Sequence, residues 1–398
     1  MLACGLIVGL TGAVAGTARG GAEPGITADT ILLGGTAPLA GPASDLAAST
    51  RGADAFFKFV NANGGVNRRK IVYKVVDDAN PGLAARDLVE QDRVFALFNT
   101  VGSAASIAVR STLGPLKIPQ LFAATGATTF GRDAAAYPAA IGFQPSYQAE
   151  GWVYGKYLAR TAAGATVAVL FQNDDDGKDL LSGLRRGLER SRVRIVGAQP
   201  YDAASGDVSA QVARLKATGA DSVVLFTTPL STVQAYQAMG KASWRPKRIV
   251  VSSASATPVT MEAAAFSQPR LAPGTLSIAT VKDPADPARR RDQGLKLYRK
   301  IMAQYAPLDD ASDPRNVSGM ASAWTVVELL TRAGKDPTRA SVLKVLGGFS
   351  AAGNPFLVPG IVVRTAGKDH FPIEQMLMQR WQKGAWSSFG GLWTYRGA

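Results

Sequence analysis

The stretch VNANGGVNRRKIVYKVVDD, residues 60–78, holds the end of one predicted element and the whole of the next. Just upstream, residues 44–62 place four apolar side chains on one helical face, namely Ala47, Ala55, Phe56 and Phe59. Gly64-Gly65 stop that helix, and residues 69–78 then have the apolar, β-branched content of a strand. Since another strand-like run lies at 31–37, the order is strand, helix, strand, which favours parallel pairing.

The same alternation continues along the chain. Further strand-like runs lie at 94–99, 119–125, 166–171, 192–199, 221–227 and 247–253. Helical patterns separate them, including one predicted over 178–190, and a helix-rich section covers 284–347. The chain closes with strand-like runs at 359–365 and 374–382. This pattern predicts an α/β protein of 398 residues with parallel sheets covered by helices, in two halves of similar layout.

The formal charge of +14 raises the question of an acidic partner. The densest basic runs, Arg289-Arg290-Arg291 and Arg185-Arg186, lack the interleaved aromatic residues of a nucleic-acid groove. We therefore expect no nucleic acid as partner, and a scattered basic surface that helps to steer a small anion.

The residue inventory argues against an enzyme. A single cysteine, Cys4, excludes an internal disulfide and any multi-cysteine zinc site, and a single histidine, His370, excludes a two-histidine metal site. His370 lies in GKDHFPIEQ, where we expect an exposed turn, and no G-x-S-x-G elbow accompanies it. Phosphate-binding and dinucleotide-binding glycine motifs are also absent from the sequence, so we expect no cofactor and no metal.

The N-terminus predicts export. Residues 2–18 form an uncharged, small and apolar run that ends in A-x-A-like sequence, at Ala13-Val14-Ala15 or near Ala22. We interpret residues 1–22 as a signal peptide whose basic n-region is missing, and expect a periplasmic protein. Because Cys4 precedes the apolar run, a lipid anchor is not expected, although a translation start further upstream would make MLAC a possible attachment site.

Loops at the predicted strand ends are rich in glycine, hydroxyl and aspartate side chains, which suit an anion at helix N-termini and equally suit ordinary helix caps. The loop FQNDDDGKD (171–179) carries three consecutive aspartates. A calcium loop is excluded, because Gln172 and Gly183 would stand at the first and twelfth ligand positions. Asp174 or Asp175 is expected to cap the following helix.

Six segments occur in an order and spacing that resemble the periplasmic leucine/isoleucine/valine-binding proteins, which are the substrate-binding components of branched-chain amino-acid ABC importers. They are ILLGGTAPLAGPAS, VNANGGVNRRKIVYKVVDDANPGLAARD, VGSAAS, KIPQLFAATGA, FQNDDDGKDLLSGLRRGL and DVSAQVARLKATGADSVVLFTTP. The resemblance implies two doubly wound, Rossmann-like lobes joined by three crossover hinge strands, with a ligand cleft between them. It assigns 26–143 plus 280–360 to the first lobe and 144–279 plus 361–398 to the second, with crossovers near 143–145, 277–281 and 359–365.

The implied function is capture of a small amino acid or related carboxylate by hinge closure, and delivery to a membrane permease by a monomeric binding protein. The alternative is a sensory or receptor module on the same fold for an aromatic or aliphatic carboxylate. Neither function is enzymatic.

The resemblance also implies site residues. Ser103, which follows Gly102, matches the serine that holds the ligand's carboxylate, and a second loop adds Ala124, Thr125 and Gly126, where Gly126 replaces a threonine. At the ammonium end, Ser253 stands where amino-acid binders place an acid. Three positions that usually hold aromatic side chains carry other residues, namely Leu46, Asp176 and Thr228, and Met320 completes the expected ligand contacts.

A desolvated ammonium group needs a carboxylate partner, which Ser253 does not provide. Two hypotheses follow: Asp176 supplies the missing charge from another position, or the ligand is an aromatic or aliphatic carboxylate without an α-amino group. We favour the second.

Overall fold

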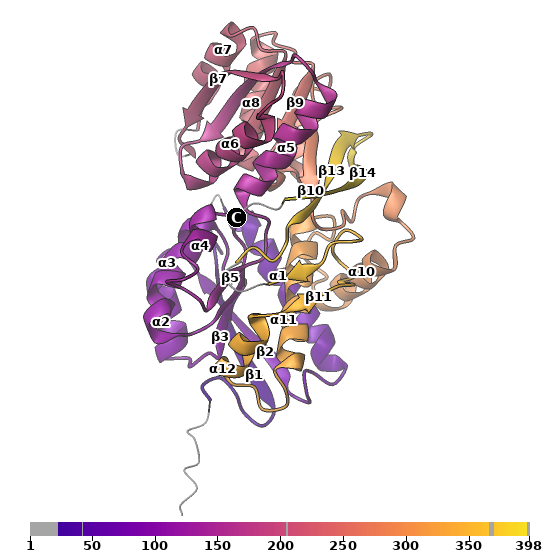
Figure 1. Cartoon of the computed structure of the whole chain (residues 1–398). Coiled ribbons are helices and arrows are strands. Elements are labelled where there is room, and N and C mark those ends of the chain that lie inside the picture. Colours follow the sequence, from indigo (N-terminus) through magenta and orange to yellow (C-terminus); the bar gives the residue numbers. More distant parts are fainter. Residues whose placement is uncertain (1–22, 42, 204–205, 366–369, 396–398) are drawn as a thin grey trace, which may run out of the picture.

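The computed structural model describes residues 23–41, 43–203, 206–365 and 370–395, which form two lobes stacked one above the other (Figure 1). The predicted signal peptide, residues 1–22 with Cys4, lies outside the described residues. No helix in the described ranges has the length and apolar character needed to cross a membrane.

The first lobe contains a five-stranded sheet whose strand pairs are all parallel, in the order β2-β1-β3-β4-β5. Its strands are β1 (Thr30–Ala37), β2 (Lys70–Asp77), β3 (Ala96–Phe98), β4 (Gln120–Ala123) and β5 (Ala140–Gly142). The quoted stretch provides β2, which pairs in register with β1 from Thr30↔Lys70 onward. The α/β class with parallel sheets is thus confirmed.

Helices from distant parts of the sequence cover this sheet (Figure 1). They are α1 (Ala48–Ala62), α2 (Pro81–Glu90), α3 (Ser103–Leu113), α4 (Thr128–Arg132), α10 (Gln293–Tyr305), α11 (Pro314–Arg332) and α12 (Arg339–Leu346). A short 3-10 helix, Ser44–Ala47, leads into α1. One buried core joins Phe57 and Phe98 of the N-terminal part to Met320 and Leu330 of α11.

The second lobe contains a seven-stranded sheet in the order β14-β13-β10-β9-β8-β6-β7. Its strands are β6 (Thr166–Gln172), β7 (Arg194–Tyr201), β8 (Ser222–Phe226), β9 (Arg248–Val251), β10 (Leu276–Ala279), β13 (Gln375–Gln382) and β14 (Ala385–Thr394). Its helices are α5 (Tyr147–Thr161), α6 (Asp175–Leu188), α7 (Ser209–Ala217), α8 (Pro229–Lys241) and α9 (Pro258–Ser267). The strands β13 and β14 are antiparallel additions at one edge.

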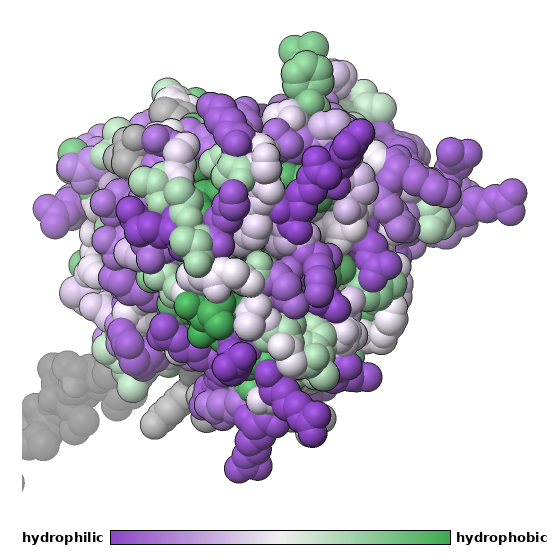
Figure 2. Space-filling model, turned by 90° about the horizontal axis from the view of Figure 1, so that it is seen from above, coloured by the Kyte–Doolittle hydropathy of each residue, from purple (hydrophilic) through white to green (hydrophobic). Residues whose placement is uncertain are grey.

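The chain returns to the first lobe between β10 and β13. There β11 (Ser350–Ala351) and β12 (Val363–Arg364) form a small antiparallel pair, and Ile361, Val363 and Ile373 pack in the first lobe's core. Viewed from above, the second lobe presents hydrophilic side chains interspersed with apolar ones (Figure 2).

Two local expectations need correction. The helix predicted over 178–190 begins at Asp175, because Asp174 caps it by accepting a hydrogen bond of 2.9 Å from the N–H of Gly177. His370 is buried rather than exposed, with 5% of its surface accessible, since its carbonyl accepts a hydrogen bond from the N–H of Gly142 beside β5. Burial, followed by the positive charge of Arg110, lowers the pKa of His370.

The helices α5 and α6 approach each other along a seam of four glycines: Gly151, Gly155, Gly183 and Gly187. A Cβ atom at Gly183 would collide with the carbonyl of Gln148, and one at Gly151 would collide with the carbonyl of Leu180. The seam therefore allows backbone-to-backbone contact, which fixes the first turn of α5 beside the middle of α6 at Gly183.

Replacing Gly183 by alanine tests this seam. Gly183→Ala should lower the free energy of unfolding by about 1–3 kcal/mol, as expected for overpacking of a close contact. Gly348→Ala is the control, because a Cβ atom there has open space around it. Denaturant unfolding gives both values, and equal stability of the two variants would contradict a close-packed seam.

Candidate functional site

The first lobe presents a pair of hydroxyl groups at the start of α3 and the end of β4. Gly102 precedes α3 with φ 89°, a conformation that favours glycine, and its N–H donates to the carbonyl of Ala124 at 3.2 Å. This turn sets the Ser103 Oγ 2.8 Å from the Thr125 Oγ1. The residues predicted to hold a carboxylate are therefore adjacent in the structure.

Gly126 stands where the resemblance implies a threonine, and the structure gives a steric reason for this difference. Its carbonyl accepts a hydrogen bond of 2.7 Å from the N–H of Tyr147, the first residue of α5. A Cβ atom at Gly126 would lie 2.5 Å from the carbonyl oxygen of Pro145 and 2.9 Å from the ring of Tyr147. Threonine therefore does not fit here unless both the Pro145 carbonyl and the Tyr147 ring move, because these two groups occupy the space of the missing side chain.

The second lobe places Asp176 on this hydroxyl pair. The Ser103 Oγ donates to the Asp176 Oδ2 at 2.8 Å, across the junction of the lobes. Burial raises the pKa of Asp176 to about 7, and the charges of Asp174, Asp179 and Asp175 act in the same direction against the hydrogen bond from Ser103. The Asp176 Oδ1 is also buried, and it has no hydrogen-bond partner within the described ranges.

A second contact crosses the junction close by. The Asp179 Oδ2 accepts a hydrogen bond of 2.7 Å from the N–H of Thr128 at the start of α4, and the Oδ1 accepts one of 3.0 Å from the Gln148 side chain. The first two turns of α6 thus contact the first lobe at two aspartates, Asp176 and Asp179.

An acid also accompanies Ser253, although not from the strand end. The Glu150 Oε1 accepts a hydrogen bond of 2.7 Å from the N–H of Ser253, and the Oε2 accepts one of 2.6 Å from its Oγ. The hydroxyl of Tyr154 lies 2.9 Å from the Oε1. Glu150 is almost fully buried, and this burial raises its pKa.

Tyr147 connects the two acids. It is half-buried on the first turn of α5, and burial raises its pKa; the negative charges of Asp176 and Glu150 act in the same direction, against a hydrogen bond with Ser103. Sequence reasoning missed Tyr147 and Glu150 because it did not predict α5. The available signal was Ser146, which caps the helix by accepting from the N–H of Ala149.

The three other residues predicted to contact the ligand, Leu46, Thr228 and Met320, have local structural roles. Leu46 packs half-buried against Ala37 and Val101. Thr228 immediately precedes α8, and its N–H donates to the hydroxyl of Tyr201 at 2.9 Å. Met320 is fully buried in the core of the first lobe, which is a packing role.

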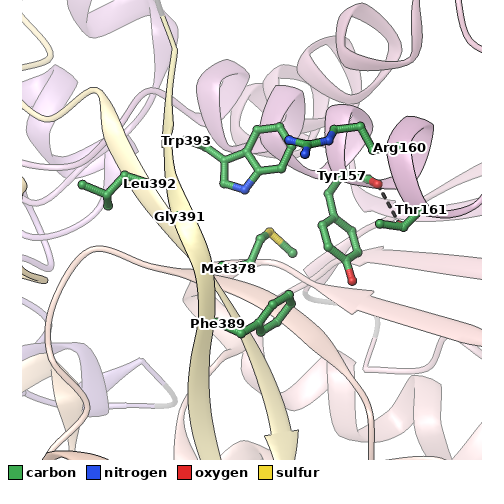
Figure 3. Close-up of a pocket in the computed structure, with 9 residues that line it drawn as sticks. Tyr157, Arg160, Thr161, Met378, Phe389, Gly391, Leu392 and Trp393 are labelled. Atoms are coloured by element: carbon green, nitrogen blue, oxygen red, sulfur yellow. Dashed lines mark hydrogen bonds between the residues drawn. The ribbon is translucent and has the colours of Figure 1, made fainter.

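A hollow of about 400 Å³ lies at the other end of α5 (Figure 3). Tyr157, Met378 and Phe389 line it, and the guanidinium of Arg160 lies 5.0 Å from the centre of the Trp393 ring. Since a helix of this length measures roughly 20 Å, this hollow is separate from the junction. In the ranges that the structure describes, no cluster of three or more His, Cys, Asp or Glu side chains could hold a metal ion.

The raised pKa of Glu150 gives a pH prediction. Between the ordinary glutamate value of 4.5 and the raised folded value, the folded state holds more protons than the unfolded state, so stability falls as pH rises. Glu150→Gln removes this dependence, and its Tm relative to wild type should rise between pH 4 and pH 7. The exposed Glu262→Gln serves as the control, and a Tm difference for Glu150→Gln that stays constant or falls would contradict the assignment.

Comparison with known proteins gives several relatives. Over 200 residues the chain is 27% identical to the Leu/Ile/Val-binding protein homolog 3 of Brucella melitensis biotype 1, and the match covers 48% of this chain and 53% of that protein. The chain thus spans about half the length of this curated relative.

Solved structures match over most of the chain. A branched-chain amino acid ABC transporter protein from Thermus thermophilus with bound valine has a TM-score of 0.79 and 18% identity, and the match covers 92% of this chain and 97% of that one. A solute-binding protein from R. palustris in complex with 4-hydroxybenzoate has a TM-score of 0.74 and 15% identity, over 92% and 97%. These likenesses show the two-lobed fold.

The family model described as periplasmic binding protein matches residues 30–385. Proteins of this kind bind solutes and are not enzymes, in agreement with the residue inventory. The chain belongs to the periplasmic binding protein family.

Proposed function

We propose that the protein is the extracytoplasmic solute-binding component of an ABC importer. It captures a small carboxylate, either an amino acid or an aromatic or aliphatic acid, and delivers it to a membrane permease as a monomer. The observation that carries this proposal is the pair of hydroxyls, Ser103 and Thr125, which lie 2.8 Å apart where the two lobes meet. Uncharged donors in a buried site suit a carboxylate.

Capture by hinge closure follows from the chain path. The resemblance implies lobes of 26–143 plus 280–360 and of 144–279 plus 361–398. We propose to move the third boundary from 360 to about 374, so that residues 361–373 belong to the first lobe. The shift is supported by Val363 and Ile373, which pack in the first lobe's core. Closure brings α6 against the first lobe, where Asp176 and Asp179 make their cross-lobe contacts.

The class of carboxylate follows from Glu150. Its oxygens already accept hydrogen bonds from the N–H and Oγ of Ser253, and Tyr154 adds a third contact. A ligand ammonium group would have to compete with these internal donors for a nearly fully buried acid. This favours an acid without an α-amino group. The relatives with bound valine and bound 4-hydroxybenzoate hold one ligand of each class.

Export is part of the same proposal. The apolar run within residues 2–18 is the expected signal, and removal of residues up to about 22 in the periplasm would produce the mature chain. Mass spectrometry of protein recovered from the periplasm measures this cleavage directly.

A ligand panel tests the function. Thermal-shift and calorimetric titrations should show binding of benzoate, 4-hydroxybenzoate or short aliphatic acids in preference to leucine and valine. Small-angle scattering should show a smaller radius of gyration when the ligand saturates the protein, because closure compacts two lobes. Binding of leucine or valine without binding of the other acids would contradict the assigned ligand class.

Ser103→Ala should weaken binding of the preferred acid by about 10-fold to 150-fold, the equivalent of 1.5–3 kcal/mol for a hydrogen bond to a charged group. Ser111→Ala is the matched control, because Ser111 lies on the same helix and its hydroxyl bonds to the carbonyl of Ile107. An unchanged affinity in Ser103→Ala would remove Ser103 from the site.

A further inference from the structure

We propose that Asp176 competes with the ligand's carboxylate for the hydroxyl hydrogen of Ser103. The protein then binds a carboxylate only together with one proton. This inference rests on the proposed function. It concerns the same hydroxyl pair, Ser103 and Thr125. It adds that the protein takes up one proton when it binds the ligand.

The hydrogen bonds at the junction run in one direction. The N–H of Ala127 donates to the Thr125 Oγ1 at 3.1 Å, so the Thr125 hydroxyl accepts there and directs its own hydrogen elsewhere. The Ser103 Oγ lies 2.8 Å from the Thr125 Oγ1 and donates its single hydrogen to the Asp176 Oδ2. The chain of donors is therefore Thr125 to Ser103 to Asp176.

This direction creates competition. A serine hydroxyl has only one hydrogen to donate. A ligand carboxylate that accepts the hydrogen of Ser103 must therefore displace the Asp176 Oδ2 from it or share the site with Asp176. Two ionised carboxylates do not share such a site, because like charges at hydrogen-bond distance repel and one of them takes up a proton.

Among the described residues, the charges that act most strongly on Asp176 are all negative and do not relieve this repulsion. The charges that raise the pKa of Asp176 come from Asp174, Asp175 and Asp179 on its own helix. The facing helix α5 adds Tyr147 and Glu150. The first lobe faces Asp176 with the hydroxyls of Ser103 and Thr125, and the N–H of Thr128 is already bonded to Asp179.

The proton has a defined place. When the carboxylate ligand enters, one proton from solvent adds to Asp176, whose buried Oδ1 makes no hydrogen bond within the described ranges. The protonated carboxyl then donates its O–H to the ligand's carboxylate, and the hydrogen of Ser103 becomes available to the ligand. On release, the ligand leaves as the carboxylate, and Asp176 returns the proton to solvent and accepts from Ser103 again.

Linkage gives the pH dependence. Asp176 has a pKa of about 7 in the closed protein, so below pH 7 it already carries the proton that the ligand requires. Above pH 7 each unit of pH should raise the dissociation constant of a carboxylate about 10-fold. Carboxylate binding should therefore strengthen as the medium becomes acidic.

Isothermal titration calorimetry with benzoate tests the proposal, and leucine serves as the second probe. Titrations at pH 5.5, 6.5, 7.5 and 8.5, each in two buffers with different ionisation enthalpies, count the protons taken up. The wild-type protein should take up about one proton per ligand at pH 8.5 and close to none at pH 5.5.

In Asp176→Asn the side-chain amide can donate a hydrogen bond to the ligand's carboxylate, and it does not titrate. Its binding should be independent of pH, and at pH 8.5 it should bind at least 10-fold more tightly than wild type. The matched control is Asp175→Asn, since Asp175 is exposed in the same first turn and should keep the wild-type profile. The proton count on the unmodified protein tests the proposal even if a variant is unstable.

The outcomes separate the two proposals. Carboxylate binding that is independent of pH, without proton uptake, would overturn the role of Asp176 and leave the solute-binding function in place. Binding of leucine that strengthens with pH and is lost in Asp176→Asn would make Asp176 a counter-charge for the ammonium group and overturn the competitor role. No binding of either probe by wild type or Asp176→Asn at any pH would overturn the proposed function itself.

Discussion

The hydrogen bond from Ser103 to Asp176 is the interaction on which the junction depends. It joins the N-terminus of a first-lobe helix to that of a second-lobe helix, and it places a carboxyl group on the two hydroxyls that suit an anion. A largely desolvated carboxyl group without a cation is costly when ionised, so its protonation depends on the groups beside it. The close packing of Tyr147 against Gly126 and the contact of Asp179 with Thr128 hold that geometry from either side.

The second buried acid, Glu150, supplies from α5 the negative charge that was expected at the strand end where Ser253 stands. Ser253 provides no charge, yet Glu150 reaches it from α5 and accepts from both its N–H and its hydroxyl. The two acids lie on consecutive helices of one lobe, whereas the hydroxyl pair belongs to the other lobe.

Much of this could be predicted from the sequence, because β8 is an apolar run, β1 and β2 are rich in apolar and β-branched residues, and the cap of α6 is an aspartate before a helical pattern. The hydroxyl pair was also predictable, since Ser103 and Thr125 follow neighbouring parallel strands. By contrast, α5 was missed because Gly151 and Gly155 interrupt its pattern, and these glycines are explained only by the helix that packs on them. The pairing of Glu150 with Ser253 joins residues 103 positions apart, which no local pattern encodes. His370 was assigned to the surface from polar neighbours, and only the tertiary fold buries it.

The glycine seam between α5 and α6 has a consequence for how the residues at the junction of the lobes can be substituted. Because the two helices touch through their backbones, Tyr147, Glu150 and Asp176 are carried on one closely packed unit. Side chains at the tips of this unit can be exchanged without disturbing the strands that join the lobes. Single substitutions at these positions would therefore change the chemistry at the junction while the packing of the two helices stays the same.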